Sequence, residues 1–208
     1  MVIEKTSIDE ANQSLEPISH RAGLWLGSVL YIQEIERYMK RLTMILLLLF
    51  VCVGCDQSTK YTARHFLEGQ QTLSYMGDIF RLSYTENTGA FLSLGAGMPE
   101  KLRFAILVVL VSIFLIVFLI FIIRSKELNS LEILSSVLII GGGLGNLIDR
   151  IINKGSVIDF MNIGLGPIRT GIFNVADLTI MAGVLMFAAF YKKKPLNQAN
   201  PADSQTRG

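Results

Sequence analysis

The sequence predicts an all-α membrane protein with four transmembrane helices and a small extracytoplasmic β-element. Hydrophobic residues make up 51% of the 208 residues and charged residues only 17%, a balance that soluble domains seldom have. The apolar residues are concentrated in four blocks, as membrane-spanning helices require. Between the first two blocks, residues 66–98 carry the turn residues and β-rich runs of short strands. One compact membrane domain accounts for residues 39–194.

Residues 1–38 precede this domain as an N-terminal extension. Residues 1–19 are polar and indicate a flexible tail, whereas residues 23–38 have the composition of an amphipathic helix that lies on the membrane surface. Met39 is followed by two cations and an apolar run, which is a natural beginning for a membrane protein. Met39 is therefore a second candidate for the start of translation, and in that case the extension is no part of the functional protein.

The four apolar blocks are interpreted as four spans. The first block is shorter than the roughly 20 residues that cross a bilayer, so we expect its helix to continue through residues 56–65, with this continuation facing protein or water. The third block contains a glycine cluster in which Gly141 and Gly145 let membrane helices approach closely. The blocks are Leu42–Cys55, Phe104–Ile123, Ile133–Ile148 and about Val175–Tyr191.

Basic residues predict the orientation of these spans, because loops on the cytoplasmic side of a membrane carry an excess of Lys and Arg. In a four-span arrangement three basic clusters fall on one side. Both termini are then cytoplasmic, residues 56–103 and 149–174 face the outside, and the polar segment 195–208 is a disordered cytoplasmic tail. The clusters are Lys40–Arg41, Arg124 with Lys126, and Lys192–Lys194.

The outer segment 66–98 is predicted to contain the β-element. Residues 79–84 are rich in β-forming side chains and indicate a strand. Gly77-Asp78 before them and Asn87-Thr88-Gly89 after them are turn sequences. We therefore expect a small sheet on the outer face of the membrane.

Two aspartates, Asp159 and Asp177, lie where the chain should least tolerate a charge. An ionisable group at a membrane boundary costs several kcal/mol, on the order of 2.5–3.5 at a helix centre, unless it is paired or solvated, so it is a functional candidate. Two carboxylates held together share a proton and can activate water for amide hydrolysis. For Asp177 a structural interpretation stays open, because Asn174 and Asp177 have the spacing of a loose capping box at the start of the fourth helix.

Polar residues on two further helix faces have alternative interpretations. Asn146, Asp149 and Arg150 share roughly one face, which either emerges into water with Arg150 snorkelling or lines a site. Asp149 is thus either a third catalytic candidate or an exposed helix end. Asp56 and Lys60 are spaced i, i+4 directly after the first span, where a partly buried pair either fixes the helix end or serves the site.

The cysteines and histidines do not indicate a metal site. Cys52 and Cys55 form the one Cys-x-x-Cys pair, whereas zinc needs about four ligands and the chain has only two histidines. Inert buried thiols are the better interpretation. The apolar run that ends at Cys55 also mimics a bacterial lipoprotein signal, yet three later spans argue against a soluble domain on a lipid anchor. No basic-aromatic pattern indicates nucleic-acid binding.

Taken together, residues 41–191 resemble the lipoprotein signal peptidases (signal peptidase II) of bacteria. Each matching block is short, but five blocks in the family's order on a four-span pattern are specific. Two departures are Phe91, where a second alanine is usual, and the long N-terminal extension. The blocks are Asp56-Gln57-Ser58-Thr59-Lys60, Asn87-Thr88-Gly89-Ala90, Gly145-Asn146-Leu147-Ile148-Asp149-Arg150, Val157-Ile158-Asp159-Phe160 and Phe173-Asn174-Val175-Ala176-Asp177.

The resemblance implies an aspartic endopeptidase of the bacterial inner membrane that cleaves prolipoproteins on the N-terminal side of a diacylglyceryl-modified cysteine. It implies no metal and no cofactor, and we expect a monomer whose partners are diacylated prolipoproteins and membrane lipids. It makes Asp159 and Asp177 the catalytic pair, near the outer leaflet, and gives Asp149 a supporting role. The residues that would line or brace the site are Asp56, Lys60, Asn87, Asn146, Arg150 and Asn174.

A non-enzymatic protein, either a small transporter or a membrane scaffold, is the competing hypothesis. It predicts that Asp159 and Asp177 lie apart, or that they form ion pairs with Arg150 and Arg169. The enzyme hypothesis predicts instead that the two carboxyl groups converge.

Overall fold

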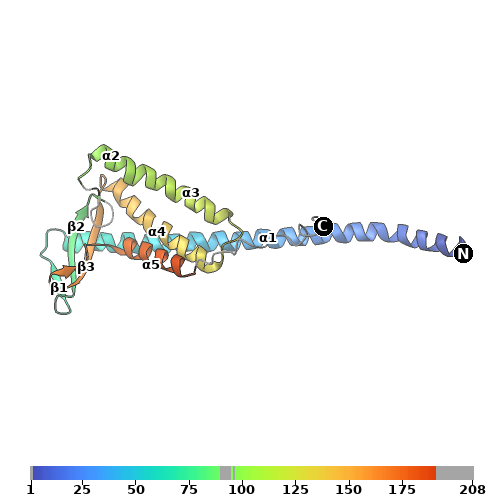
Figure 1. Cartoon of the computed structure of the whole chain (residues 1–208), viewed down its shortest axis with the longest axis horizontal. Coiled ribbons are helices and arrows are strands. Elements are labelled where there is room, and N and C mark those ends of the chain that lie inside the picture. Colours follow the sequence, from blue (N-terminus) through green and yellow to red (C-terminus); the bar gives the residue numbers. More distant parts are fainter. Residues whose placement is uncertain (1, 90–94, 96, 191–208) are drawn as a thin grey trace, which may run out of the picture. The chain divides into compact units, whose positions relative to one another are not determined.

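The computed structural model describes residues 2–89, 95 and 97–190 of the chain. It divides into two compact units, Met1–Leu46 and Leu47–Gly208, and the second unit holds the C-terminal part of α1 and all later elements (Figure 1). The elements are α1 (Val2–Leu67), β1 (Leu73–Tyr75), β2 (Phe80–Asn87), α2 (Glu100–Phe104), the π-helical turn η2 (Ala105–Leu110), α3 (Val111–Arg124), α4 (Ser130–Ile152), β3 (Val157–Leu165), β4 (Ile168–Arg169) and α5 (Val175–Phe190).

Three of the described helices are long and apolar enough to cross a membrane. They are Trp25–Leu67 within α1, the continuous helix Glu100–Arg124 formed by α2, η2 and α3, and α4. The described part of α5 is also apolar but has only 16 residues. These lengths agree with a multi-pass membrane protein, and a fourth span through α5 stays a prediction. The predicted cytoplasmic tail, residues 195–208, lies outside the described residues.

The N-terminal segment differs from the expectation. α1 runs without interruption from Val2, so the flexible tail predicted for residues 1–19 is wrong. Residues 23–38 are helical as predicted, but they are part of α1 and not a separate helix, and their position on the membrane surface stays a prediction. Neither glycine nor proline occurs between Gly27 and Gly54, so no stop signal separates residues 28–38 from the first span. Pro17 and Gly23 lie within α1 and do not end it. Whether the extension belongs to the functional protein stays a prediction.

The glycines of α4 bring it close to α1. A methyl group added at Gly141 would lie 2.7 Å from Cβ of Cys52 on α1, and one added at Gly145 would collide with the carboxylate of Asp56. The predicted close approach at Gly141 and Gly145 is therefore confirmed. This contact brings the polar residues at the ends of the two helices within reach of one another.

The four strands form one antiparallel sheet in the order β1-β2-β3-β4. The strand predicted at residues 79–84 is confirmed as β2, and Gly77 and Asp78 form the predicted turn with φ of 64° and 73°. The expectation that the β-element comes from residues 66–98 is incomplete, because β3 and β4 come from residues 157–169. The first four residues of β3 are buried, so they lack the polar alternation that reveals a strand with one exposed face.

The sheet lies crosswise at one end of α1, α4 and α5 (Figure 1). Ala63 and Leu67, in the last turns of α1, pack against Phe160 of β3 in a small apolar core. Burial of these side chains holds β3 against the helix ends. Asp159 precedes Phe160 on β3 and bonds to Asn174, which also bonds to Asn146 near the end of α4.

Candidate active site

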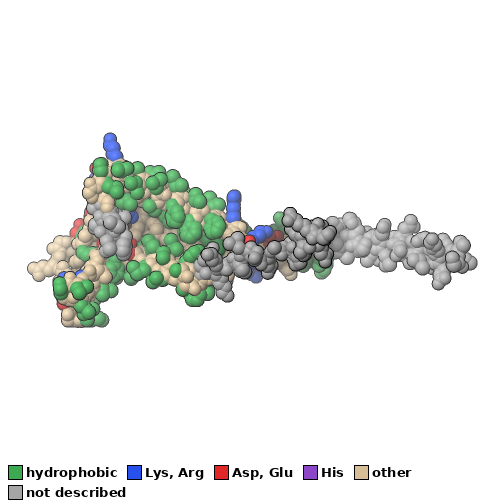
Figure 2. All heavy atoms as spheres, viewed as in Figure 1, with side chains coloured by type: hydrophobic (Ala, Val, Ile, Leu, Met, Phe, Trp, Pro, Cys, Tyr) green, Lys and Arg blue, Asp and Glu red, His purple; other side chains and the backbone are tan. Residues whose placement is uncertain are grey.

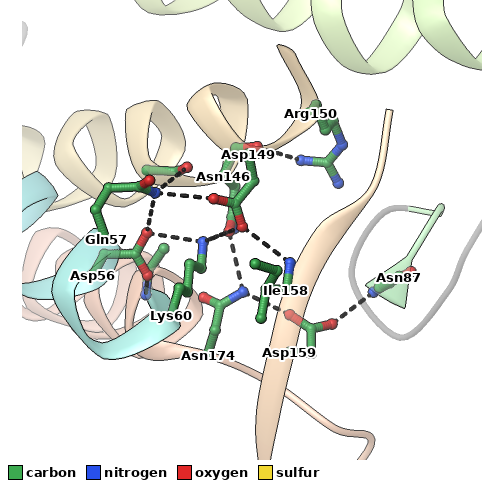
Figure 3. A network of polar contacts seen from close by, with 12 residues as sticks. Asp56, Gln57, Lys60, Asn87, Asn146, Asp149, Arg150, Ile158, Asp159 and Asn174 are labelled. Carbon is green, nitrogen blue, oxygen red and sulfur yellow. Dashed lines mark hydrogen bonds and ion pairs between the residues drawn. The ribbon is translucent and has the colours of Figure 1, made fainter. Parts of the chain in front are cut away.

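The polar residues that the sequence singled out come together where the helices meet the sheet; Figure 3 shows them apart from Asp177, which bonds to Asn146. Five different elements or their flanks contribute, so residues far apart in the chain become neighbours. Asp56 and Lys60 come from α1, Asn87 from the end of β2, Asn146, Asp149 and Arg150 from the last turns of α4, Asp159 from β3, and Asn174 and Asp177 from the start of α5.

Lys60 lies at the centre of a buried ionic cluster. Its ammonium group is 2.8 Å from Oδ2 of Asp56 and 3.0 Å from Oδ2 of Asp149, and it donates a hydrogen bond of 2.9 Å to Oδ1 of Asn146. The Lys60 side chain is only 2% exposed, so all three of its protons are used inside the protein. The Asp56–Lys60 pair therefore ties α1 to α4 and does not act as a surface ion pair.

Gln57 is a member of this cluster that the sequence did not single out. Its Nε2 lies within hydrogen-bonding distance of Asp56, Asp149 and the backbone oxygen of Gly145, at 3.2, 3.0 and 3.1 Å. A glutamine beside an aspartate has no distinctive spacing, and its position within the first matched block was the one available signal. Gln57 donates to Oδ1 of Asp149, the oxygen that the Lys60 ion pair does not use, and it shares Oδ2 of Asp56 with Lys60.

Asp149 is a structural member of the cluster. One of its carboxylate oxygens accepts from Gln57, and the other accepts from Lys60 and from the backbone N–H of Ile158 at 3.0 Å. Asp149 is 2% exposed, so its interpretation as an exposed helix end is wrong. The bond to Ile158 fixes the start of β3 and hence the position of Asp159.

The amide of Asn146 links the ionic cluster to Asp177. Because the Lys60 ammonium group can only donate, Oδ1 of Asn146 must face it, and the amide nitrogen then points away. The Asn146 amide nitrogen donates to Oδ1 of Asp177 at 2.9 Å. The Asn146 amide oxygen accepts a second hydrogen bond, from the side chain of Asn174, at 3.1 Å. Lys60 thereby determines which atom of Asn146 meets the carboxyl group of Asp177.

Asn174 and Asp177 form a reciprocal cap at the start of α5. The side chain of Asn174 accepts from the backbone N–H of Asp177 at 3.0 Å, and Oδ2 of Asp177 accepts from the backbone N–H of Asn174 at 3.2 Å. The predicted capping interaction is confirmed. It leaves the amide nitrogen of Asn174 free to donate to Oδ1 of Asp159 at 2.6 Å, so one cap positions both aspartates.

Asp159 is the more deeply buried of the two aspartates. It is 2% exposed and accepts from Asn174 and, at 2.9 Å, from the side chain of Asn87. Burial raises the pKa of Asp159 to about 6, the hydrogen bond from Asn87 opposes this rise, and the charge of Asp177 adds to it. The influence of Asp177 on this pKa means that the two carboxyl groups are electrostatically coupled.

Arg150 braces the segment that carries Asn87. It is 9% exposed, so the snorkelling interpretation is wrong. It donates to the backbone oxygens of Gly89 at 2.8 Å and of Asn146 at 3.3 Å. Among the described residues, neither Arg150 nor Arg169 forms a salt bridge with Asp159 or Asp177, contrary to what the transporter or scaffold hypothesis predicts.

A groove of about 390 Å³ opens beside this site. Its polar end carries Asn146, Arg150 and Asp177, and the rest of its wall is apolar. Asp177 is partly exposed in the groove, whereas Asp159 is buried behind it. The apolar lining comes from η2, α3 and α5 and consists of Leu107, Val111, Ile180, Met181, Val184 and Leu185.

The described residues contain no group of three or more His, Cys, Asp or Glu side chains with the arrangement of a metal site. Cys52 is half-buried, whereas Cys55 is exposed, so the prediction of buried thiols is wrong for Cys55. The functional groups of the polar cluster are therefore carboxyl groups, side-chain amides and a buried ammonium group. Two coupled carboxyl groups at the end of an apolar groove suit the activation of water next to an extended apolar ligand.

Comparisons with known proteins agree with this arrangement. A sequence model of the family described as signal peptidase (SPase) II matches residues 48–192. The lipoprotein signal peptidase of Pelodictyon phaeoclathratiforme is 36% identical over 168 residues, which are 76% of this chain and 93% of that protein. The lipoprotein signal peptidase of Borrelia hermsii is 32% identical over 158 residues, 72% of this chain and 90% of that protein. A bacterial membrane enzyme solved at 1.9 Å resolution superimposes with a TM-score of 0.60 at 26% identity, over 73% of this chain and 94% of that structure.

Proposed function

Because this chain belongs to the signal peptidase II family, we propose that it is a membrane aspartic endopeptidase acting on prolipoproteins. It removes the signal peptide by cleaving on the N-terminal side of a diacylglyceryl-modified cysteine. It crosses the inner membrane four times with both termini in the cytoplasm, and its active site lies near the outer leaflet. Asp159 and Asp177 are the catalytic residues.

The observation that carries this proposal is the continuous chain of hydrogen bonds between the two aspartates. Asp159 accepts from Asn174, Asn174 donates to Asn146, and Asn146 donates to Asp177. Two amide side chains thus hold two coupled carboxyl groups in a fixed relation. Such a pair retains one proton more firmly than an isolated carboxylate, because the second ionisation is opposed by the first.

The environments of the two aspartates support different roles. Burial and the raised pKa make Asp159 the member that keeps the shared proton, and Asp177 opens to the groove through which water and substrate arrive. Asp177 takes a proton from water as the water oxygen attacks the scissile carbonyl carbon, while Asp159 gives its proton to the carbonyl oxygen. When the carbon–nitrogen bond breaks, Asp177 protonates the leaving amine and the proton on oxygen returns to Asp159. No covalent intermediate is formed.

The groove supports the choice of substrate class. A lipid-modified cysteine leaves the bilayer at a cost of about 0.8 kcal/mol for each buried CH₂ group, so the peptide bond next to it must be cut at the membrane. The apolar wall of the groove suits acyl chains or an apolar signal peptide, and the polar end places Asn146 and Arg150 near the backbone of a bound segment.

The direct test is cleavage of a diacylated prolipoprotein by purified protein in liposomes. We expect Asp159→Asn and Asp177→Asn each to lower turnover at least about 100-fold, since each removes one of the acid–base partners while keeping the side-chain shape. Asp78→Asn is the matched control, because Asp78 is an acid on the exposed β1–β2 turn, bonded to Arg81 and Ser74 away from the site. The control should cleave like the wild type.

Retention of wild-type turnover by Asp159→Asn or Asp177→Asn would remove that residue from the catalytic pair. If neither substitution changed turnover, the aspartic mechanism would be wrong. If the wild-type protein itself failed to cleave the substrate, the structural or transporter hypothesis would replace the enzyme.

A further inference from the structure

β2 contains a β-bulge in the middle of its ladder with β3. The ladder is regular on both sides, but the two regular stretches differ in register by one residue. Two residues of β2, Ser83 and Tyr84, therefore lie opposite a single residue of β3, Phe160. Bulges of this kind redirect side chains and are frequent next to functional sites. The pairs on the two sides of the bulge are Leu82 with Met161 and Thr85 with Asp159.

The bulge decides which side chain of β2 meets Asp159. Side chains alternate between the two faces of a strand, so a shift of one residue sends each of them to the other face. In the bulged register Asn87 lies opposite Val157 and donates to Oδ2 of Asp159 at 2.9 Å (Figure 3). If the register of the first regular stretch continued, Glu86 would lie opposite Val157 instead. The bulge therefore gives Asp159 an amide that donates, where a carboxylate that only accepts would otherwise lie.

Three side chains from α1 and β2 bond to one another beside the bulge. Nε of Arg64 on α1 donates to the hydroxyl of Tyr84 at 3.2 Å, and its Nη2 donates to Oε1 of Glu86 at 3.3 Å. The Tyr84 hydroxyl donates to the same Glu86 oxygen at 2.8 Å, and its ring packs against the small apolar core at the end of α1. A change to the other register would turn Tyr84 and Glu86 to the opposite face and separate them from Arg64.

This Arg64–Tyr84–Glu86 group lies at the surface. The side chains of Arg64 and Glu86 are 40% and 43% exposed. Figure 2 shows acidic and basic side chains at the end of the second unit that carries the sheet, whereas its helices present mainly hydrophobic side chains. An ion pair in such a setting contributes little to overall stability. A small preference is nevertheless enough to select one of two registers that differ by a single residue.

We propose that the Arg64–Tyr84–Glu86 group positions the partner of Asp159: it selects the bulged register of β2, in which Asn87 and not Glu86 faces this aspartate. Tyr84 is the central positioning residue, because its hydroxyl bonds to both other members of the group. The importance of this selection for cleavage rests on the proposed function, whereas its effect on the proton affinity of Asp159 does not.

The proton of Asp159 reports the register. Burial raises the pKa of Asp159 to about 6, and the hydrogen bond from Asn87 is the strongest of the influences that oppose this rise. Loss of that bond, or the arrival of the Glu86 carboxylate in its place, raises the pKa further. The charged groups that act on Asp159 from the other elements are Asp177 of α5, Lys60 of α1 and Arg150 of α4.

The test compares the melting temperatures of the full chain and of its Asp159→Asn partner in detergent from about pH 4 to about pH 9. The pH above which their difference becomes constant marks the pKa of Asp159 in the folded protein. We expect Asn87→Ala to raise this pH by about 1 pH unit, since it removes a hydrogen bond to a charged group. Tyr84→Phe keeps the ring and removes only the hydroxyl, and it should cause a smaller rise. Tyr75→Phe, on the edge strand β1, is the matched control and should cause none.

Deletion of Ser83 separates the register from any direct effect of Tyr84. The shortened β2 has no extra residue, so a regular ladder places Asn87 opposite Val157 without any selection between registers. Tyr84→Phe should therefore leave the pH unchanged in the chain that lacks Ser83. Should that chain fail to fold, Arg64→Met, which leaves β2 intact, must repeat the rise that Tyr84→Phe causes in the full chain.

Three results would overturn the proposal. They are an unchanged pH for Asn87→Ala, an unchanged pH for Tyr84→Phe, and an equal rise from Tyr84→Phe with and without Ser83. A uniform loss of melting temperature at every pH would show that Tyr84 serves stability alone, and it counts as the second of these results. The melts require no turnover, so a protein that did not cleave prolipoprotein would still decide the question.

Discussion

At the scale of single residues, the chemistry of Lys60 orders the site. An ammonium group has three protons and no lone pair, so it needs three acceptors when it is buried. Asp56, Asp149 and Asn146 supply them at 2.8 to 3.0 Å. Burying two carboxylates around one cation costs several kcal/mol of desolvation for each ion, which hydrogen bonds from Gln57 and from the backbone of Ala176 and Ile158 offset. The cluster thus exists to hold Asn146 and β3 in place.

Substitution of Asp149 separates this support from the chemistry. We expect Asp149→Asn to retain measurable cleavage but to lower the amount of folded protein, because it weakens the buried contact to Lys60 and disturbs the bonds from Gln57 and from the backbone N–H of Ile158, the last of which fixes the start of β3. A loss of about 1–3 kcal/mol in the free energy of unfolding is the expected size. Asp177→Asn should show the reverse, with normal yield and no turnover.

Protein quantified in the membrane is the necessary measure for this comparison, since poor expression imitates poor catalysis. If Asp149→Asn were inactive at normal yield while Asp177→Asn stayed active, the catalytic pair would have to be redrawn as Asp149 with Asp159.

The raised pKa of Asp159 predicts a pH dependence of stability. In the folded chain this group binds its proton with a pKa of about 6, against 3.8 for an ordinary aspartate, so the folded state holds the proton more firmly. The stabilisation is fully present below pH 3.8 and is lost as the pH rises through about 6, an effect of roughly 3 kcal/mol. Thermal unfolding in detergent at about pH 5 and about pH 7.5 should therefore show wild type losing stability relative to Asp159→Asn at the higher pH. Parallel melting temperatures for the two proteins would contradict the assignment.

At the scale of elements, the close packing of α4 against its neighbours brings the polar ends of the helices together. Gly142 faces the start of α5, where an added methyl group would collide with the backbone oxygen of Ala176. Ala176 is also the residue whose N–H donates to Asp56 at 2.9 Å. A displacement of α5 at this point would therefore lengthen the hydrogen bond from Ala176 to Asp56 and shift Asp177, the next residue of the helix.

Gly142→Ala should accordingly destabilise the protein and reduce cleavage. Overpacking costs about 1–3 kcal/mol, and the backbone of α5 cannot move aside as a flexible side chain would. Gly54→Ala is the matched control, because a methyl group at Gly54 meets nothing within 4 Å. That control should melt at the same or a higher temperature, since alanine is a better helix former than glycine by about 0.5–1 kcal/mol. Equal behaviour of the two variants in a thermal melt would show that α4 and α5 are not packed as described.

At the scale of the whole molecule, the matched family region and the polar site both lie after Leu47. The family model begins at residue 48, and no residue of the candidate site precedes Asp56. The first unit, Met1–Leu46, contributes the part of α1 that precedes this region. We therefore propose that the second unit carries the function of the molecule.

A chain that begins at Met39 should insert into the membrane and cleave prolipoprotein at the rate of the full chain. It keeps the basic pair Lys40–Arg41, the apolar block that follows, and every residue of the site. The measurement is turnover per molecule of protein in liposomes, with the full chain prepared alongside. If the shorter chain fails to accumulate or loses activity while the full chain works, residues 1–38 have a role of their own.

The sequence by itself determined the class of the protein, the positions of three long apolar helices and most of the polar residues that the structure brings together. Apolar blocks and helix caps depend on residues only a few positions apart, so a sequence pattern can reveal them. The cap formed by Asn174 and Asp177, three positions apart, is an example. Short motifs singled out Asp56, Lys60, Asn146 and Asp159 without any knowledge of their contacts, and the structure places all four in the polar cluster.

The tertiary structure alone decided which of these residues touch and what each contact does. Gln57 joins the cluster, and Asp149 is buried under β3, only because α1, α4 and β3 converge there. The strand β3 was missed since its first residues are buried and its partners on β2 lie 70 to 83 positions earlier in the chain, from Asn87↔Val157 to Phe80↔Ile163, beyond the reach of any local periodicity. The pairing of β3 with β2 and the burial of β3 require long loops to close, and a local sequence pattern does not reveal which distant segments meet.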